Sequence, residues 1–386
     1  MIDSTRVVAG ESGRSANPRH LYVHVPFCAR RCSYCDFSIA VRREVPVGEY
    51  LSALRAELAR RNRAGDEWRL GTLYFGGGTP SRLGADGVAR ALDLVREHAT
   101  LEDDCEVTLE ANPEDVSAEA VRRWRDSGVT RLSIGSQSFD NRALEWMHRT
   151  HDSSQIEGAV DDARGAGIDN LSLDLIFALP ETLGRKWEDD LERLIRLSPR
   201  HVSLYGLTIE PNTPAGRWRD RGTLHEAPEE RYESDYLTAH ADLAAAGYEH
   251  YEVSNYAQSG YQSRHNSAYW QRVPYVGVGP SAHSFDGSAR SWNVAPYTDW
   301  HRRLGEGLDV KSGTEILGPE ECSAEVVFLG LRTTGGLPAT LAIIERSRSW
   351  VEAGWAIIAD GRIHLTPAGW LRLDTFAADL TLVGSP

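Results

Sequence analysis

Short runs of hydrophobic residues recur through the first 210 residues of the chain, and stretches with a helical period separate them. The runs are rich in valine, isoleucine, leucine and aromatic residues, which favours β-strands. They predict six strands, at residues 21–25, 72–75, 106–110, 131–137, 170–177 and 201–208.

The stretches between these strands predict helices. Leu51, Leu54 and Leu58 fall on one face of a predicted helix over residues 49–63. The other predicted helices pass through Val88 and Val95, start after Ser117, surround Leu144, and cover residues 153–166 and 186–197. Strands that alternate with helices in this way pair in parallel, with right-handed crossovers.

This alternation predicts an α/β fold. An open doubly wound sheet would satisfy the pattern, as would a barrel. We favour a partial (β/α)6 TIM-like barrel of parallel strands, because polar residues recur at the ends of successive strands.

The pattern changes after residue 210. Residues 226–246 predict one long amphipathic helix that starts around Pro228, and a region rich in Tyr, Trp, Gly and Ser follows it. From Pro319 the order of helices, turn and strand resembles a small winged-helix fold. We therefore expect a flexible tail (1–20), the barrel (21–215), a flanking region (216–318) and a small C-terminal winged-helix-like domain (319–386).

Composition narrows the function. The net charge of −14 argues against a nucleic-acid binder. The chain has no apolar run of transmembrane length, and its first residues lack the hydrophobic core of a secretory signal. Clustered thiols without an export signal favour a cytoplasmic location.

Three of the five cysteines, Cys28, Cys32 and Cys35, stand within eight residues in a C-x3-C-x2-C pattern. Thiolates this close favour a metal centre. Buried small side chains, a redox disulfide and a zinc site are the alternatives, but structural zinc normally takes four ligands in paired spacing. We favour an iron–sulfur cluster, because three cysteines would leave one iron of a cubane open for a small molecule.

A glycine run, Gly76 to Pro80, follows the second predicted strand. It could form a tight turn and nothing more, but glycines also let backbone amides approach a ligand closely. The G-x-G-x-x-G pattern of dinucleotide binding is absent from this run.

Glu110, Gln137 and Asp174 lie at or near the ends of the third, fourth and fifth predicted strands. Strand ends in a parallel barrel share one mouth, so these side chains are candidates for ligand binding. Arg149 could hold a carboxylate there, or it could be a solvated arginine at a helix end.

Residues 265–270 (His-Asn-Ser-Ala-Tyr-Trp) form a second cluster. His265 could ligate haem iron, and the neighbouring aromatic rings could stack on a flat macrocycle. A lone histidine more often hydrogen-bonds within its own loop, and the sequence by itself slightly favours that interpretation of His265.

Together these motifs resemble the radical S-adenosylmethionine enzymes, and among them the HemW-type haem chaperones related to oxygen-independent coproporphyrinogen III oxidase. The resemblance runs from about Leu21 to the C-terminus. The motifs that carry it are Tyr22-x-His-x-Pro-Phe-Cys28, Gly76-Gly-Gly-Thr-Pro80, Ser172-x-Asp174-x-Ile176, Ser254-Asn-Tyr-Ala257 and His265-Asn-x-x-Tyr-Trp270.

The resemblance implies that the three cysteines hold a [4Fe–4S] cluster whose fourth iron takes S-adenosylmethionine. It implies that this cofactor's site contains Tyr22, Tyr34, Gly77, Gly78, Thr79, Glu110, Gln137, Arg149 and Asp174. In the family, the reduced cluster splits the cofactor to a 5′-deoxyadenosyl radical. The resemblance also makes His265 the candidate haem contact.

Two departures from the oxidase favour a chaperone that passes haem to apo-proteins. The oxidase motif continues to a further cysteine where this chain has Phe37, and only about twenty residues precede Tyr22. The oxidase remains the alternative from another functional class, and a zinc-binding structural protein is the third. The expected partners are haem, haem-accepting apo-proteins and an electron donor, with a homodimer and peripheral membrane contact as further expectations.

Overall fold

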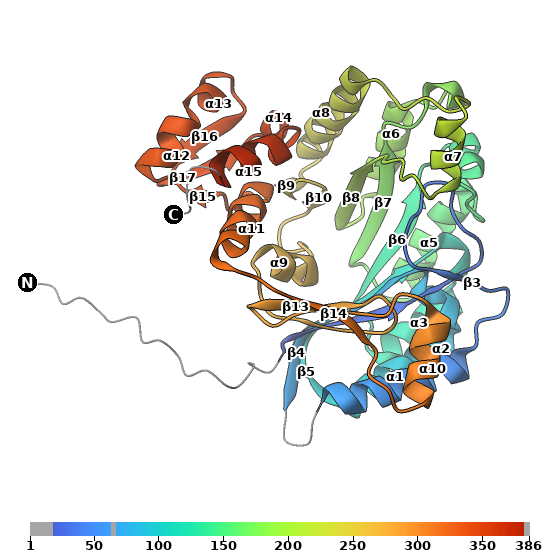
Figure 1. Cartoon of the computed structure of the whole chain (residues 1–386). Coiled ribbons are helices and arrows are strands. Elements are labelled where there is room, and N and C mark those ends of the chain that lie inside the picture. The colour runs from blue at the N-terminus through green and yellow to red at the C-terminus, as the bar shows by residue number, and fades with distance from the viewer. Residues whose placement is uncertain (1–17, 63–66, 382–386) are drawn as a thin grey trace, which may run out of the picture.

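The computed structural model describes residues 18–62 and 67–381, so the predicted flexible tail lies mostly outside the described residues. A nine-stranded sheet forms the centre of the molecule (Figure 1), in the strand order β11-β1-β4-β5-β6-β7-β8-β10-β9. Six consecutive strands of this order, β1 to β8, pair in parallel. They are β1 (His20–Val25), β4 (Trp68–Gly77), β5 (Ala99–Ala111), β6 (Arg131–Gln137), β7 (Leu171–Phe177) and β8 (His201–Gly206).

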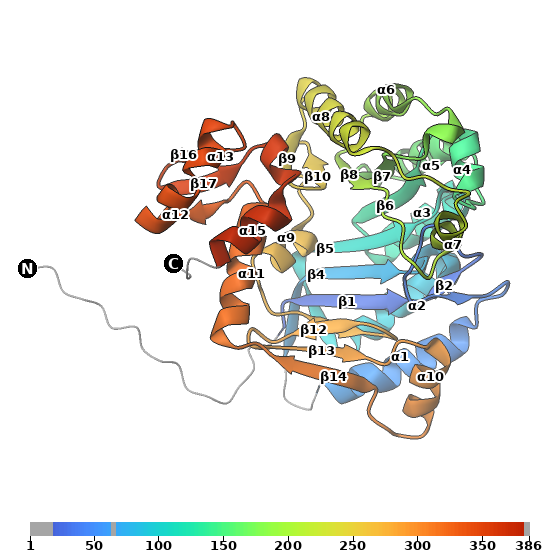
Figure 2. The same ribbon diagram turned by 45° about the horizontal axis from the view of Figure 1, so that its top comes forward.

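The predicted fold class is confirmed. The six predicted strands follow one another round an arc (Figure 2), and in the described part of the chain the edge strands β11 and β9 do not pair, so the barrel is partial. β5 begins seven residues earlier than predicted, because its first part carries exposed acidic residues that hide the strand pattern.

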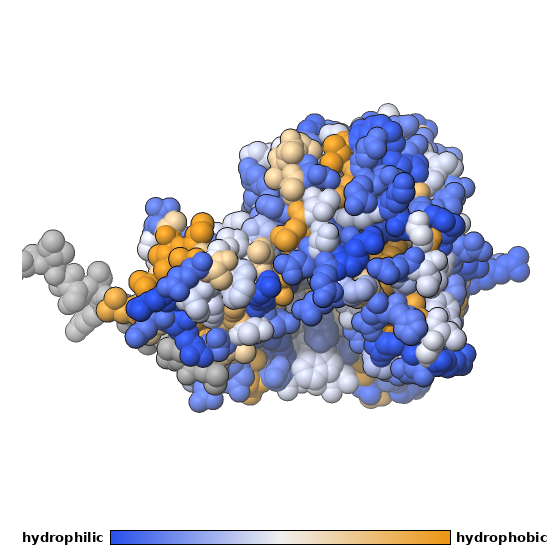
Figure 3. All heavy atoms as spheres, turned by 90° about the horizontal axis from the view of Figure 1, so that it is seen from above, coloured by the Kyte–Doolittle hydropathy of each residue, from blue (hydrophilic) through white to orange (hydrophobic). Residues whose placement is uncertain are grey.

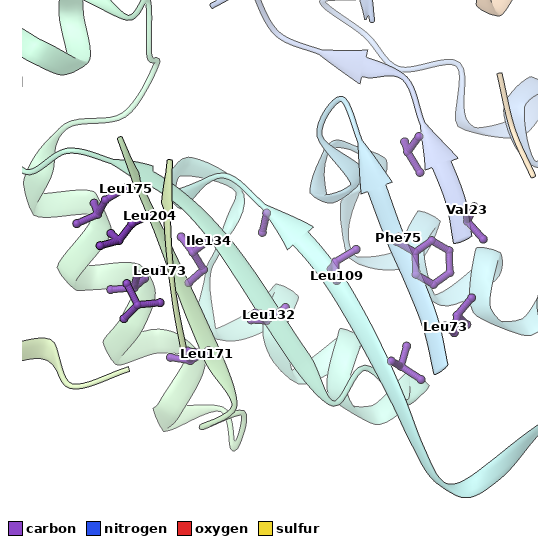
Figure 4. Close-up of a cluster of buried hydrophobic side chains, with 14 of the residues drawn as sticks. Val23, Leu73, Phe75, Leu109, Leu132, Ile134, Leu171, Leu173, Leu175 and Leu204 are labelled. Carbon is purple, nitrogen blue, oxygen red and sulfur yellow. The ribbon is translucent and has the colours of Figure 1, made fainter. Parts of the chain in front are cut away.

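Hydrophobic residues cover the outer face of the sheet. Along each strand every second side chain points outward, and these side chains form one buried core (Figure 4). Ten of them are labelled there, namely Val23, Leu73, Phe75, Leu109, Leu132, Ile134, Leu171, Leu173, Leu175 and Leu204. The helices of the crossovers supply the other side of this core. They include α1 (Val47–Arg61), α2 (Gly84–Arg96), α3 (Ala118–Ser127), α5 (Ser153–Gly165) and α6 (Trp187–Leu197).

The alternate positions face the inside of the partial barrel, and most are polar. On β6 these are Arg131, Ser133 and Gln137, with Gly135 between them. The other parallel strands contribute His20, Tyr22, His24, Thr72, Tyr74, Glu106, Thr108, Glu110, Ser172, Asp174, His201, Ser203 and Tyr205. Period-two alternation, interrupted by a register shift in β4 and in β6, therefore builds an apolar outside under the helices and a polar inside.

The sheet continues past both ends of the parallel set. β11 (Val276–Val278) pairs in parallel with β1, whereas β10 (Asn255–Ala257) and β9 (Glu249–Glu252) add antiparallel strands beyond β8. The sequence indicates strand-like pieces in this region, but the pieces are too short to reveal their partners. Before them, α8 (Glu229–Ala245) begins after Pro228, as expected.

Helix α9 (Arg264–Trp270) covers the amino-terminal part of the inner face. The backbone N–H groups of Arg264 and His265 donate to the Glu106 carboxylate at 3.1 and 3.0 Å. Figure 2 shows α9 beside the tails of the β4 and β5 arrows, opposite the end at which the cysteine loop lies. The interior therefore has a floor at α9 and a mouth at the carboxyl ends of the strands.

A second small sheet lies next to α1. It contains β12 (His283–Phe285), β13 (Ala289–Asn293) and β14 (Lys311–Ile316), with α10 (Tyr297–Gly305) between the last two. Glu57 of α1 is buried and accepts hydrogen bonds from Asn293, Trp300 and the Gly279 N–H. This carboxylate ties the flanking residues to the barrel.

The C-terminal unit (residues 319–381) has helices and a small antiparallel sheet in the order expected of a winged-helix fold. Its elements are α11 (Pro319–Arg332), β15 (Leu337–Pro338), α12 (Leu341–Arg346), α13 (Arg348–Glu352), β16 (Ala356–Ala359), β17 (Arg362–Leu365), α14 (Pro367–Trp370) and α15 (Leu373–Thr381). α11 contacts α9 and α14 contacts α8, so the unit packs against the open side of the barrel.

Most of the surface seen from above is hydrophilic, but hydrophobic side chains gather over the C-terminal unit at the left of Figure 3. Leu341 is 86% exposed and Ile357 is 52% exposed in this unit. Among the described residues, no helix is both long enough and apolar enough to cross a bilayer.

Candidate functional site

The three clustered cysteines lie on one loop at the mouth of the barrel. The loop leaves β1 through the short strand β2 (Phe27–Cys28), which pairs with β3 (Ala40–Val41). Cys28, Cys32 and Cys35 all line a cavity of about 450 Å³ that occupies the interior of the partial barrel. The structure therefore brings the predicted thiols to one side of one cavity.

These thiols form a suitable donor set for a cluster. All five cysteines of the chain are free, so none of the three is held in a disulfide. Burial raises the pKa of Cys28 and Cys35, to about 11 for Cys35, so their thiolate forms need nearby positive charge such as iron. Among the described residues, no three His, Cys, Asp or Glu side chains are close enough to share one metal ion. A cubane differs, because each thiolate binds its own iron.

Close packing with neighbouring residues requires glycine in the run after β4, and the run also borders the cavity. A Cβ atom at Gly77 would lie 2.5 Å from the His24 ring, and one at Gly78 would lie 2.7 Å from the Pro26 carbonyl. Gly77 also has a φ of +113°, which disfavours other residues. Gly77, Gly78 and Thr79 line the cavity, so both explanations of the run, a tight turn and a ligand-contacting loop, hold together.

Glu110 and Asp174 project from β5 and β7 into the cavity, as predicted. Glu110 accepts hydrogen bonds from the Tyr74 hydroxyl at 2.9 Å and from the Gly77 N–H at 3.1 Å. Burial raises the pKa of Glu110 to about 7, although both donors act to lower it. Burial also raises the pKa of Asp174, which accepts from Ser133 at 3.1 Å and Ser172 at 3.0 Å.

Arg149 links the cysteine loop to the ends of two strands. Its guanidinium donates to the Cys32 Sγ at 3.6 Å, to the Asn112 side chain at 2.6 Å and to the Gly135 carbonyl at 2.8 Å. The reading as a solvated helix-end arginine is therefore wrong. Gln137 lies nearby in the cavity lining with a φ of +66°, a strained value for a non-glycine residue.

Two tyrosines of the predicted site take different places. Tyr34 lines the cavity, whereas Tyr22 lies one layer behind, stacked on Tyr74 with ring centroids 6.1 Å apart. The Tyr22 hydroxyl is 3.2 Å from the His24 Nδ1. Tyr74, which the sequence did not single out, therefore occupies the wall in front of Tyr22.

His265 is buried at the floor with both ring nitrogens in hydrogen bonds. Its Nδ1 is 2.6 Å from the Thr72 hydroxyl and its Nε2 is 2.8 Å from the Tyr269 hydroxyl. A histidine with both ring nitrogens in hydrogen bonds to neighbouring side chains stabilises the local structure. The haem contact stays a prediction, and it requires the ring to leave one of these partners. The neighbouring Asn266, not His265, lines the cavity.

Sequence reasoning missed several cavity residues, most of which lie on the same strand faces, whereas Asn112 follows β5 and Asn266 lies on α9. They are Tyr74, Asn112, Arg131, Ser133, Ser203, Tyr205 and Asn266. Period-two alternation carried the signal: Ser133 and Arg131 share a face with Gln137, and Ser203 and Tyr205 share a face on β8. The inner face extends along the whole strand, so polar residues before the strand ends also reach the cavity.

The sequence profile of the Radical SAM superfamily matches residues 22–197, which contain the cysteine loop, the glycine run and the polar strand faces. The solved structure of coproporphyrinogen III oxidase (HemN) from Escherichia coli, a radical SAM enzyme, superposes with a TM-score of 0.81. It covers 96% of this chain and 91% of its own at 22% identity, which shows a shared fold. Fold and site thus define a radical SAM protein.

Relatives narrow the class further. Heme chaperone HemW from Mycobacterium tuberculosis H37Rv is 38% identical over 383 residues, which is 95% of each chain. Heme chaperone HemW from Bacillus subtilis is 35% identical over 82% of this chain and 84% of its own, and that from Escherichia coli K12 is 39% identical over 69% and 70%. The chain belongs to the Heme chaperone HemW family.

Proposed function

We propose that this chain is a haem chaperone that binds a [4Fe–4S] cluster, S-adenosylmethionine and haem, and transfers haem to acceptor proteins. The observation that carries the proposal is the 38% identity to Heme chaperone HemW from Mycobacterium tuberculosis across 95% of each chain. The HemN fold alone would not support it, because one fold can serve different functions.

In this proposal Cys28, Cys32 and Cys35 hold the cluster, which supplies one-electron chemistry when bound. The chain's own residues bind and orient the second cofactor. Arg149 holds the cysteine loop against the strand ends, and Glu110 offers a carboxylate to a cationic group. The proposed S-adenosylmethionine site comprises Tyr22, Tyr34, Gly77, Gly78, Thr79, Glu110, Gln137, Arg149 and Asp174, with Tyr22 acting through Tyr74.

Phe37 favours the chaperone over the oxidase. Its side chain lies at the cavity with 62% of its surface exposed, where the oxidase motif has a further cysteine. A phenyl ring cannot ligate metal, but it offers a flat apolar surface to a macrocycle at the mouth. Acceptor apo-proteins, an electron donor, a cytoplasmic location, a homodimer and peripheral membrane contact belong to the same proposal.

The test starts with anaerobic reconstitution of the full chain, with a variant in which the three cysteines are alanine as the control. We expect about four irons and four sulfides in the wild type and none in the control. Haem bound to the wild type should then pass to an apo-haem protein, and added coproporphyrinogen should stay intact in the presence of reductant and S-adenosylmethionine. Decarboxylated coproporphyrinogen would overturn the chaperone proposal in favour of the oxidase.

A further inference from the structure

A buried guanidinium lies in the cavity without a partner. Arg131 begins β6, and its side chain is 1% exposed although it lines the cavity. Its Nε has no hydrogen-bond partner, and the side chain forms no ion pair with any carboxylate of residues 18–62 and 67–381. An unpaired charge away from water is costly, so buried arginines are normally paired. The protein thus holds a positive charge inside the cavity that its described residues do not pair.

Two carboxylates that feel the charge of Arg131 already have other hydrogen-bond partners. Arg131 acts to lower the pKa of both Glu110 and Asp174, which places its charge within electrostatic reach of these carboxylates. Glu110 nevertheless takes its hydrogen bonds from Tyr74 and the glycine run, and Asp174 takes them from serine hydroxyls. Neutral donors therefore satisfy both carboxylates, and neither carboxylate pairs with the Arg131 guanidinium.

Helix α9 contributes a second free donor to the same cavity. The backbone N–H of Asn266 is used in the helix cap, where it donates to the Ser263 hydroxyl at 3.3 Å. Its carboxamide forms no hydrogen bond with any described residue, and Asn266 lines the cavity together with Arg131. A guanidinium fork and an amide NH2 are both donors, and the fork matches the two oxygens of a carboxylate.

We propose that Arg131, assisted by Asn266, binds a carboxylate of the organic ligand that fills this cavity, and that in the proposed haem chaperone this carboxylate is a haem propionate. The propionate enters as an anion and forms hydrogen bonds with the guanidinium, so the buried charge gains its partner only in the loaded protein. The assignment rests on the proposed function for the identity of the ligand. The existence of an anion site rests on Arg131 alone.

The binding test compares haem with haem dimethyl ester, whose propionates carry no charge, on wild type and Arg131→Gln. The wild type should bind haem more tightly than the ester. Arg131→Gln should weaken the binding of haem by about 10- to 100-fold and leave the binding of the ester unchanged. Arg123→Gln, which removes a guanidinium from the outer surface, is the matched control and should bind like wild type. Equal affinity changes for haem and ester, or no change for either, would overturn the proposal.

Two further measurements separate the outcomes. S-adenosylmethionine also carries a carboxylate, so its affinity for the reconstituted Arg131→Gln protein should stay within about twofold of wild type. A loss confined to S-adenosylmethionine would assign Arg131 to that cofactor and overturn the propionate assignment. The second is the thermal midpoint of ligand-free Arg131→Met, which should equal or exceed that of wild type, because an unpaired buried charge is removed. A midpoint several degrees lower would make Arg131 structural and overturn the anion site, whether or not haem binds.

Absence of haem binding by the wild type would contradict the proposed function, whatever the thermal midpoint of the Arg131 variant shows.

Discussion

Glu110 is a cavity residue whose charge changes near neutral pH. Its pKa of about 7 lies well above the usual value for glutamate, since the carboxylate is buried. The ionised form would attract the ammonium and sulfonium charges of S-adenosylmethionine, whereas the protonated form would not. Affinity for a cationic ligand should therefore depend on pH at this residue.

We predict that the affinity of the reconstituted wild type for S-adenosylmethionine increases between pH 6 and pH 8, and that Glu110→Gln removes this increase. Calorimetric titration at both pH values measures it. Glu114→Gln is the control, because hydrogen bonds from His151 and Thr150 outweigh burial and hold the pKa of Glu114 at about 2, so its charge is constant over this range. An unchanged pH dependence in Glu110→Gln would contradict the assignment.

The same shift makes a prediction about stability. An acid whose folded pKa is raised binds its proton more tightly in the folded state, so it costs stability once pH exceeds the unfolded pKa. The free energy of unfolding of Glu110→Gln minus that of wild type should therefore be larger at pH 8 than at pH 5, by up to about 3 kcal/mol. Denaturant titrations at the two pH values test the sign.

The hydrogen bonds of His265 predict that replacing this residue destabilises the fold, in addition to any effect on haem binding. His265→Ala removes one partner from the buried Thr72 hydroxyl, which keeps His20, and one from the half-buried Tyr269 hydroxyl, so we expect a loss of about 2 kcal/mol in unfolding free energy. Haem titration of the same variant decides the contact: affinity that stays at the wild-type value removes His265 from the haem site. Tyr269→Phe, which removes one of the two hydrogen bonds, is the matched control.

At the scale of elements, the strand-to-loop turn after β4 positions the glycine run between the cysteine loop and Glu110. Gly77 lies against the His24 ring and donates its N–H to Glu110. Gly84 also has a positive φ, of +73°, but a Cβ there would meet no atom within 4 Å. Substitution of Gly84 therefore tests the cost of backbone conformation alone, whereas substitution of Gly77 adds the cost of a steric clash.

We predict that Gly84→Ala lowers the free energy of unfolding by about 1–3 kcal/mol, because a φ of +73° with a ψ of 176° lies in a region essentially restricted to glycine. Gly77→Ala should cost more than about 3 kcal/mol, because the collision with His24 adds to that strain. Chemical denaturation of both variants gives the comparison. Equal losses would show that the His24 ring moves away without cost.

At the scale of the whole molecule, one buried ion pair joins the C-terminal unit to the barrel edge. Arg332 at the end of α11 lies 2.8 Å from the Glu252 carboxylate of β9, and its guanidinium stacks over Trp270 at 4.3 Å. The Glu252 side chain is fully buried, and backbone hydrogen bonds join Arg332 and Thr334 to the same edge. Breaking the pair leaves a buried charge alone.

Arg332→Met should lower the free energy of unfolding by about 3–5 kcal/mol, and Arg332→Met with Glu252→Gln should recover most of the loss. The loss should be smaller at pH 5 than at pH 8, because burial already raises the pKa of Glu252 and the lone carboxylate can then be protonated. Arg123→Met, at an exposed pair, is the control and should cost under about 1 kcal/mol. Limited proteolysis of Arg332→Met tests the proposed division of the chain, 21–215, 216–318 and 319–386, through cleavage near Pro319.

Local patterns in the sequence determined much of this protein. Period-two and helical spacing predicted the six parallel strands from β1 to β8, and the limits of β6 matched the prediction, because both periods follow from the geometry of a single element. The spacing of Cys28, Cys32 and Cys35 indicated a metal centre for the same reason. The α/β class and the cysteine, glycine and carboxylate positions therefore needed no tertiary information.

Non-local pairing decided the rest. β11, β10 and β9 are each three or four residues long, and only pairing with β1, β8 and β10 respectively makes them part of the sheet. Whether a buried polar group has a partner depends on residues far away in the chain, so the hydrogen bonds of His265 and the isolation of Arg131 could not be read from spacing. The chain predicted where the cavity opens, and tertiary structure alone decided which charge is left unpaired inside it.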